Sequence, residues 1–304
     1  MKSDNLQKFK VIKNIESIEL LDVRNTCKDL LSPERFDIAM ANSRLINVYK
    51  ILYKSRDHRV VGYIVEPEGD GKIPCVVWNR GGSREFGAIN PEYLFTNVLA
   101  QLAIAGYFVI ASQYSGNSGS EGVDEMGGSD IDDILNLYPI LKKYHRADNT
   151  KIGMVGGSRG GMMTFKMLSL VKWIKAVVVT APMVDMVSGI KFRPEMKDHY
   201  KSMFGGLKRD MISRSAFYWV DKLYKKTPIL LMHGTADWRV SVLSTLEMAK
   251  KLYEEKISYR MIIFEGDDHG LSANRKEAII NTIQWLDRFV KNSERLPNLK
   301  LRGK

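Results

Sequence analysis

Residues 151–162 read KIGMVGGSRGGM, and this stretch decides how the rest of the chain is interpreted. The apolar run 151–155 favours a buried strand, and a helix-like run, 162–170, follows shortly after Ser158. Between the two lies the pattern Gly-x-Ser-x-Gly, whose glycines permit a bend in which larger side chains would clash. Such a turn holds the serine hydroxyl clear of the backbone, where a carbonyl group can reach it. The stretch predicts a nucleophilic serine, although taken alone it also fits a glycine-rich loop with a solvated serine.

Two later loops supply the base and the acid that a nucleophilic serine needs. The apolar segment Ile229–Met232 is followed by the loop 233–237, which ends at Asp237. A second apolar segment, Met261–Phe264, is followed by a loop that contains His269. Because the carboxyl ends of parallel strands meet at one edge of a sheet, we expect these side chains to lie together. His269 would take the serine proton, and Asp237 would hold the imidazole in the right tautomer.

Other residues compete for these two roles. His233 is a rival base, but hydrogen bonding within the Asp237 loop is the role that we favour for it. Asp267 and Asp268 are rival acids beside His269 in the sequence. Adjacent residues rarely point a carboxylate at a neighbour's ring, so we predict Asp237 as the acid.

A serine nucleophile also needs hydrogen-bond donors for the oxyanion. One donor should be the backbone N–H of Arg159, the residue after the serine. The other should come from the loop NRGGS at 79–83, through Gly81 or Gly82, although an ordinary glycine turn is the alternative. We expect Arg80, Tyr114 and Trp219 to contact the substrate, and the charge of Arg80 and Arg159 to favour anionic groups near the scissile bond.

The chain resembles the catalytic domain of the prolyl oligopeptidase family of serine peptidases, over residues from about Tyr53 to Val290. Short segments that follow the family order carry the resemblance: Tyr53–His58, Val61–Pro67, Ala105–Val109, Gly116–Gly119, Gly157–Met162, Phe204–Gly206, Arg214–Ala216 and Thr227–Ile229. The resemblance implies an α/β-hydrolase fold and cleavage of short peptides.

The sequence also departs from the family pattern. Members usually carry a β-propeller before this domain, and only about 50 residues precede the resemblance here. The family often has Tyr or His where this chain has Arg80, and often Tyr where it has Arg159. An arginine common in the loop after the strand at 107–111 is replaced by Ser115. Because of these differences, the resemblance implies hydrolase activity more firmly than peptidase activity.

The order of strands and helices predicts an α/β fold, an α/β-hydrolase with a mainly parallel sheet and helices on both faces. Residues 1–42 form an extension of uncertain form, and residues 43–304 form the hydrolase domain. Within that domain the pattern breaks at about 185–224, a stretch rich in large side chains that we interpret as a small cap. Apolar residues at helical spacing between Ile131 and Leu141 predict one helix there.

The composition and charge of the chain limit the classes of protein to which it can belong. With 44% hydrophobic residues the chain can bury a sizeable core, and the net charge of +11 is scattered except for a basic carboxyl end. Cys27 and Cys75 are expected to be reduced, which suits a cytoplasmic protein. We expect no signal peptide, no membrane partner and no nucleic-acid partner.

The sequence therefore predicts a serine hydrolase that cleaves a small peptide, amide or ester through an acyl-enzyme, with no metal and no cofactor. A carboxylesterase without peptidase activity is one alternative. A non-catalytic binding protein on a hydrolase fold is another.

Overall fold

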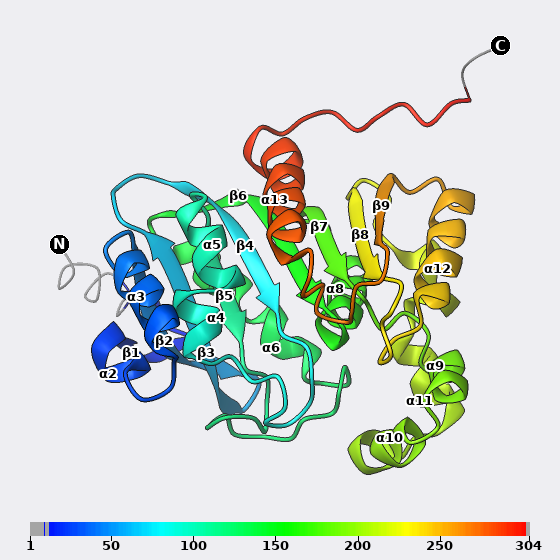
Figure 1. Ribbon diagram of the computed structural model, residues 1–304, viewed down its shortest axis with the longest axis horizontal. Helices are drawn as coiled ribbons and strands as arrows, with labels where there is room; N and C mark the ends of the chain where they lie inside the picture. Colours follow the sequence, from blue (N-terminus) through cyan, green and yellow to red (C-terminus); the bar gives the residue numbers. More distant parts are fainter. Residues whose placement is uncertain (1–8, 10–11, 302–304) are drawn as a thin grey trace. The chain divides into compact units, whose positions relative to one another are not determined.

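A computed structural model describes residue 9 and residues 12–301 of the chain. Contacts divide the chain into two compact units, 1–152 and 153–304. Figure 1 shows the elements of both units, coloured along the sequence.

The first unit contains a mixed sheet with helices. Its elements are β1 (Ile15–Leu20), α2 (Val23–Cys27), α3 (Pro33–Asn42), β2 (Ile46–Ser55), β3 (His58–Pro67), β4 (Ile73–Asn79), α4 (Pro91–Phe95), α5 (Val98–Ile104), β5 (Phe108–Ser112), α6 (Ile131–Leu135) and α7 (Tyr138–Lys143). The strand order is β1-β2-β3-β5-β4. The first pairs are antiparallel, and β4 and β5 run parallel. The next strand, β6 (Ala147–Gly157), crosses from the first unit into the second.

The second unit continues with α8 (Arg159–Leu170), β7 (Ile174–Thr180), α9 (Met186–Phe192), α10 (Met196–Phe204), α11 (Lys208–Arg214), the 3₁₀ turns η1 (Ala216–Tyr218) and η2 (Val220–Lys222), β8 (Ile229–Gly234), α12 (Val242–Glu254), β9 (Tyr259–Phe264), α13 (Arg275–Leu286) and the π-helical turn η3 (Asp287–Lys291). Strands β7, β8 and β9 are parallel neighbours. Helix α8 packs on β7, α12 packs on β8 and β9, and α13 packs on β7 and β8.

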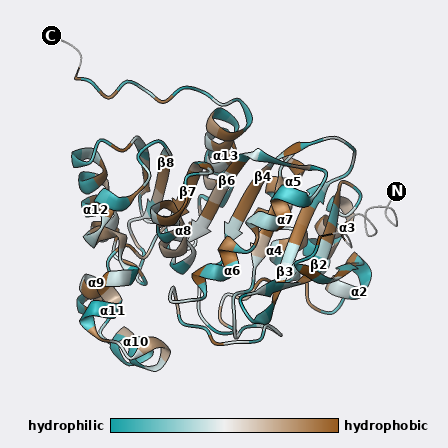
Figure 2. Cartoon of the chain, turned by 180° about the vertical axis from the view of Figure 1, so that it is seen from behind, coloured by the Kyte–Doolittle hydropathy of each residue, from teal (hydrophilic) through white to brown (hydrophobic). Residues whose placement is uncertain are grey.

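The strands carry the apolar core of each unit. All five residues of β5 and all six of β8 are buried. Figure 2 shows the brown, apolar colour along the central strands, while teal residues lie on helices such as α12. Strands buried on both faces read as continuous apolar runs, which is why their positions could be predicted from the sequence.

One part of the chain differs from the sequence-based expectation. Residues 131–141 form α6 and α7 rather than one helix, because Pro139 near the start of α7 has no N–H to continue the earlier helix. Within the predicted extension, β1 pairs with β2 along Ile15–Leu20. The boundary after residue 42 stays a prediction.

A buried ion pair lies inside the first unit. Arg146 Nη1 is 3.1 Å from Glu66 Oε2, and the two side chains are 2% and 0% exposed. Tyr144 donates its hydroxyl to both carboxylate oxygens of Glu66, and Phe9 stacks on the Tyr144 ring with 4.1 Å between centroids. Burial raises the pKa of Glu66 despite these partners. The charge of Arg146 opposes this rise in the pKa of Glu66, because it favours the ionised carboxyl.

Replacing Arg146 should destabilise the fold more than replacing an exposed cation. Arg146→Met leaves Glu66 buried without its cation, and we expect the free energy of unfolding in urea to fall by about 3–5 kcal/mol. The loss should be smaller at low pH, because protonated Glu66 needs no counter-ion. Lys225→Met, which breaks the exposed Lys225–Glu255 pair, is the control and should change little. Equal effects of the two substitutions would contradict this account of the ion pair.

Candidate active site

Ser158 follows the last residue of β6 and precedes the first residue of α8. Its backbone has φ 55° and ψ −121°, a conformation that a non-glycine residue rarely adopts. Its N–H donates to Thr180 O at 2.9 Å, and its carbonyl accepts from Gly161 N at 3.0 Å and Met183 N at 3.1 Å. These bonds hold the strained backbone. Within the described residues the hydroxyl makes no hydrogen bond, and contacts to a catalytic base often close only when substrate binds.

The glycines around Ser158 are required by close contacts. A Cβ at Gly156 would lie 2.3 Å from Gly160 O, and a Cβ at Gly161 would lie 2.6 Å from Pro182 Cβ. Both separations are shorter than any normal non-bonded contact. Only glycine lets the strand, the turn and the helix approach one another this closely, which explains the first glycine of the Gly-x-Ser-x-Gly pattern and the glycine that follows the pattern at 161.

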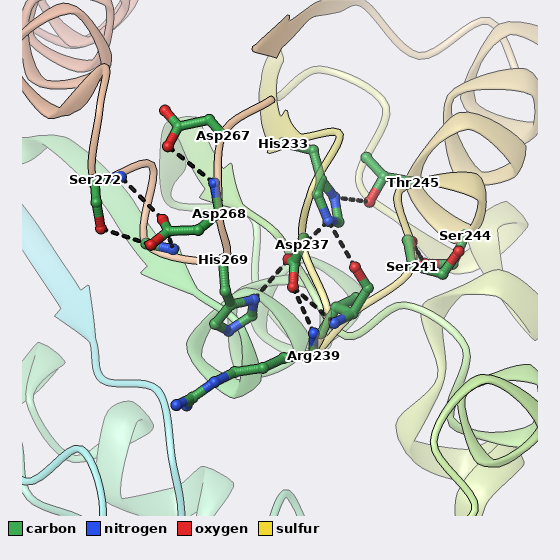
Figure 3. Close-up of polar contacts among 12 residues, drawn as sticks. His233, Asp237, Arg239, Ser241, Ser244, Thr245, Asp267, Asp268, His269 and Ser272 are labelled. Carbon is green, nitrogen blue, oxygen red and sulfur yellow. Dashed lines mark hydrogen bonds and ion pairs between the residues drawn. The ribbon is translucent and has the colours of Figure 1, made fainter. Parts of the chain in front are cut away.

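Asp237 and His269 meet as the sequence predicts. His269 Nδ1 lies 2.7 Å from Asp237 Oδ2, and Figure 3 shows the two side chains pointing toward each other from separate loops. The other oxygen, Oδ1, accepts the backbone N–H groups of Arg239 at 2.8 Å and Val240 at 3.0 Å. With Nδ1 donating to the carboxylate, the Nε2 atom of His269 is left as the proton acceptor.

The carboxylate of Asp237 is buried but stays ionised. Burial alone would raise its pKa, but hydrogen bonds from His233 and His269 outweigh burial and hold the pKa well below its ordinary value. Asp237 is therefore negatively charged throughout the neutral pH range. A charged acceptor next to Nδ1 stabilises the imidazolium form of His269.

His233 bonds to the same carboxylate from β8. Its Nε2 atom lies 3.0 Å from Asp237 Oδ2 and 3.0 Å from Val240 O, and its Nδ1 atom lies 2.8 Å from Thr245 Oγ1. The ring is completely buried, whereas the His269 side chain is 18% exposed. Of the two histidines, His269 is the one that can reach a substrate.

The rival carboxylates have other partners. Asp267 accepts from the backbone N–H groups of Asp268, Ala273 and Asn274, and from the side-chain amide of Asn274. Asp268 accepts from Gly270 N, Ser272 N and Ser272 Oγ. Both carboxylates shape the loop that carries His269, as Figure 3 shows, and neither bonds to its ring. Because Asn274 bonds to Asp267, its side chain does not cap α13.

The loops that carry Asp237 and His269 are bound together. Thr235 N donates to Phe264 O, and Ala236 N donates to Asp267 O, both at 2.9 Å. Gly266 N donates to Thr235 Oγ1 at 2.8 Å. At Gly234 the contact is so close that a Cβ would lie 2.3 Å from Asp267 O. The distance between acid and base is therefore fixed by backbone contacts.

The predicted oxyanion loop lies in the first unit, and its backbone shape requires glycine at position 82. Gly82 has φ 68°, and a Cβ there would lie 1.9 Å from Phe86 O. Gly81 and Gly82 are half-buried. Their role as oxyanion donors stays a prediction, as does that of the Arg159 backbone.

Arg80 and Tyr114, which the sequence predicts to contact the substrate, are both completely buried. The Arg80 guanidinium donates to the carbonyl groups of Gly81, Gln113, Arg84 and Phe86. The Tyr114 hydroxyl donates to Arg80 O at 3.2 Å. These side chains hold loops of the first unit and present no exposed group to a ligand.

The other two residues expected near the substrate are Arg159 and Trp219. The Arg159 side chain is completely buried, so it offers no exposed cation for an anionic substrate. Trp219 is half-buried, and its indole N–H donates to Ile212 O at 3.1 Å. Trp219 remains a candidate for substrate contact only through the apolar part of its ring.

The cap segment is helical and touches the Asp237 loop. Figure 1 shows α9, α10 and α11 beyond the carboxyl ends of β7 and β8. Arg193 Cζ lies 4.8 Å from the ring centre of Trp238, and Arg239 Cζ lies 5.0 Å from it. Trp238 is 60% exposed, so this stack is an accessible aromatic group beside the acid.

Sequence reasoning missed several of these contacts. Arg239, Val240 and Thr245 complete the support of Asp237, but only the first two have a sequence signal. An aspartate often binds backbone N–H groups two and three residues later, and Asp237 does so. Thr245 lies on α12, and no local pattern connects it to His233.

Comparisons with known proteins show which family and fold the chain has. The sequence profile described as "Prolyl oligopeptidase family" (Peptidase_S9) matches residues 93–293. The chain is 28% identical over 217 residues to the "Uncharacterized peptidase YtmA" of Bacillus subtilis, covering 69% of this chain and 81% of that protein. It is 24% identical over 238 residues to the "Acylamino-acid-releasing enzyme" of Mus musculus, covering 71% of this chain and 31% of that protein. The chain thus spans less than a third of the mouse enzyme.

A solved structure has the same fold. The acylaminoacyl peptidase of Pyrococcus horikoshii superposes with a TM-score of 0.73 at 22% identity, covering 84% of this chain and 44% of that one. The predicted α/β-hydrolase fold is confirmed. Among the described residues, no helix has the length and apolarity needed to cross a membrane.

Replacing Gly234 should separate the two loops. Gly234→Ala places a methyl group against Asp267 O, and we expect the free energy of unfolding to fall by about 1–3 kcal/mol. Gly189→Ala is the matched control, because a Cβ there meets nothing within 4 Å and α9 gains helix propensity. Urea denaturation of both variants tests this. A Gly234→Ala protein as stable as the control would show that the contact does not restrain the loops.

Proposed function

This chain belongs to the prolyl oligopeptidase family of serine hydrolases, and on that premise we propose that it cleaves amide bonds in short peptides. Ser158 attacks the carbonyl carbon of the substrate, and His269 Nε2 accepts the serine proton. The proton then passes to the leaving amine as the carbon–nitrogen bond breaks, leaving an acyl-enzyme on Ser158. Water, deprotonated by His269, releases the acid and restores the serine.

The observation that carries the proposal is the 2.7 Å contact between His269 Nδ1 and Asp237 Oδ2. It supports Nδ1 of His269 as the donor to the carboxylate, which leaves Nε2 to act as a base, and the carboxylate stabilises the imidazolium formed during attack. The positive φ of Ser158 supports the same proposal, because strain of this kind is costly and is found where a side chain must be presented.

We propose the Arg159 backbone N–H as one oxyanion donor, with Gly81 or Gly82 as the other. The position of Arg159 at the start of α8 supports its role, since a helix amino terminus favours negative charge. The positive φ of Gly82 supports the second, because the loop reaches this shape only with glycine.

We propose N-acylated short peptides as the first substrates to test, since the mouse relative is named as an acylamino-acid-releasing enzyme. The test compares kcat/KM for an N-acetyl-aminoacyl amide, the same amide with a free amino terminus, and the matching ester. Preference for the acetylated amide supports this choice. Turnover of the ester alone would mean that the protein is an esterase.

We propose a cytoplasmic location. Cys27 and Cys75 are both free and buried, which suits a reducing compartment. Fractionation of the source cells tests this, and recovery outside the cytoplasm would contradict it.

Ser158→Ala should remove activity and keep the fold. The hydroxyl makes no hydrogen bond within the described residues, so its loss costs little packing, while kcat should fall by about 10⁴-fold or more. A fluorophosphonate probe should label the wild type and spare the variant. Hydrolysis at the wild-type rate by the purified variant would rule out Ser158 as the nucleophile.

Asp237→Asn should lower kcat by about 10⁴-fold, because an amide in place of the carboxylate favours the wrong tautomer of His269. Asp268→Asn is the matched control from the neighbouring loop and should have a much smaller effect. Steady-state kinetics on one substrate gives the ranking. If Asp268→Asn were the more damaging change, the acid would have been misassigned.

A further inference from the structure

Two imidazole rings share one oxygen of the candidate acid. Asp237 Oδ2 lies 2.7 Å from His269 Nδ1 and 3.0 Å from His233 Nε2. We infer that His233 is a positioning residue that lowers the proton affinity of His269 by donating to their shared carboxylate. The inference rests on the proposed function, because it concerns the base of that mechanism.

The protonation of His233 follows from its partners. Its Nε2 atom faces two acceptors, Asp237 Oδ2 and Val240 O, so this nitrogen carries a hydrogen. Its Nδ1 atom faces the hydroxyl of Thr245 at 2.8 Å, and the hydroxyl can donate to it. The resulting chain of donors runs from Thr245 through His233 to Asp237, and each bond strengthens the next.

The ring of His233 has no freedom to turn away from Asp237. It lies on β8 with 0% exposure, and Thr245 on α12 is equally buried. Figure 3 shows the ring between the Thr245 hydroxyl and the Asp237 carboxylate. A donor fixed in this way acts on the carboxylate in every state of the catalytic cycle.

The chemical consequence concerns His269. A carboxylate that accepts a second N–H has less electron density to offer His269, so it stabilises the imidazolium less. Without His233, Asp237 becomes a stronger acceptor and the pKa of His269 rises. The other charged groups of the second unit at this point are Arg239, from the loop after β8, and Asp267 and Asp268, from the loop of His269. As carboxylates, Asp267 and Asp268 have no hydrogen to donate to Asp237 Oδ2.

The test measures the pKa of His269 by NMR in a Ser158→Ala background, so it needs no turnover. His269→Gln identifies the signal. We expect His233→Phe, which removes the donor, to raise the pKa of His269 by about half a unit or more. His233→Gln, which can donate from its amide to the same oxygen, should return the pKa toward the parent value.

A second pair of variants leaves His233 in place. Thr245→Val removes the hydroxyl behind the ring and should raise the pKa of His269 by a smaller amount, while Thr245→Ser should restore it. Ser244→Ala is the control on the same helix, because its hydroxyl donates to Ser241 O and does not contact His233. This pair decides the question if His233→Phe does not fold.

Two results would overturn the inference. One is an unchanged pKa of His269 in His233→Phe and Thr245→Val. The other is an equal shift in His233→Phe and His233→Gln, which would indicate a role in packing alone. Neither result depends on whether the protein hydrolyses peptides, so a failure of the proposed function is seen separately, in the kinetics of Ser158→Ala.

Discussion

The carboxylate of Asp237 is the group on which the candidate site depends. It is buried, and a buried charge is tolerated only where hydrogen bonds replace the water it has lost. Two imidazole rings and two backbone N–H groups do so here. Each of these donors also fixes a part of the chain: β8, the turn after it and the loop of His269. Because this buried carboxylate must be hydrogen-bonded, the segments that carry its donors are held at fixed positions around it.

Close contacts between backbone segments also restrain the geometry of the candidate site at other positions in the second unit. Gly156, Gly161 and Gly234 each lie where a methyl group would collide with a neighbouring segment. At the first two positions the contact shapes the turn of Ser158, and at the third it joins the loops of acid and base. Protein interiors are packed too densely to absorb such collisions, so these positions restrain the geometry more firmly than side-chain contacts could.

Much of the fold could be predicted from the sequence because its strands are continuous apolar runs followed by loops with distinctive residues. The pairing of Asp237 with His269 was predicted for the same reason, since both follow such runs. The burial of Arg80 and Arg159 was not, because arginine is usually exposed and nothing local in the sequence indicates otherwise. The contact of Arg193 with Trp238 joins segments that are far apart in the chain, so no local pattern in the sequence indicates it.

The buried guanidinium of Arg80 has a consequence for the loop that surrounds it. Its hydrogen bonds turn carbonyl groups of the loop inward, among them that of Gly81. In a trans peptide the N–H points opposite to the C=O, so the N–H of Gly82 is directed away from the cation. A buried cation can in this way set the direction of a peptide group that it does not contact through the N–H. At the position where the family often has Tyr or His, this arginine acts on the backbone of its own loop.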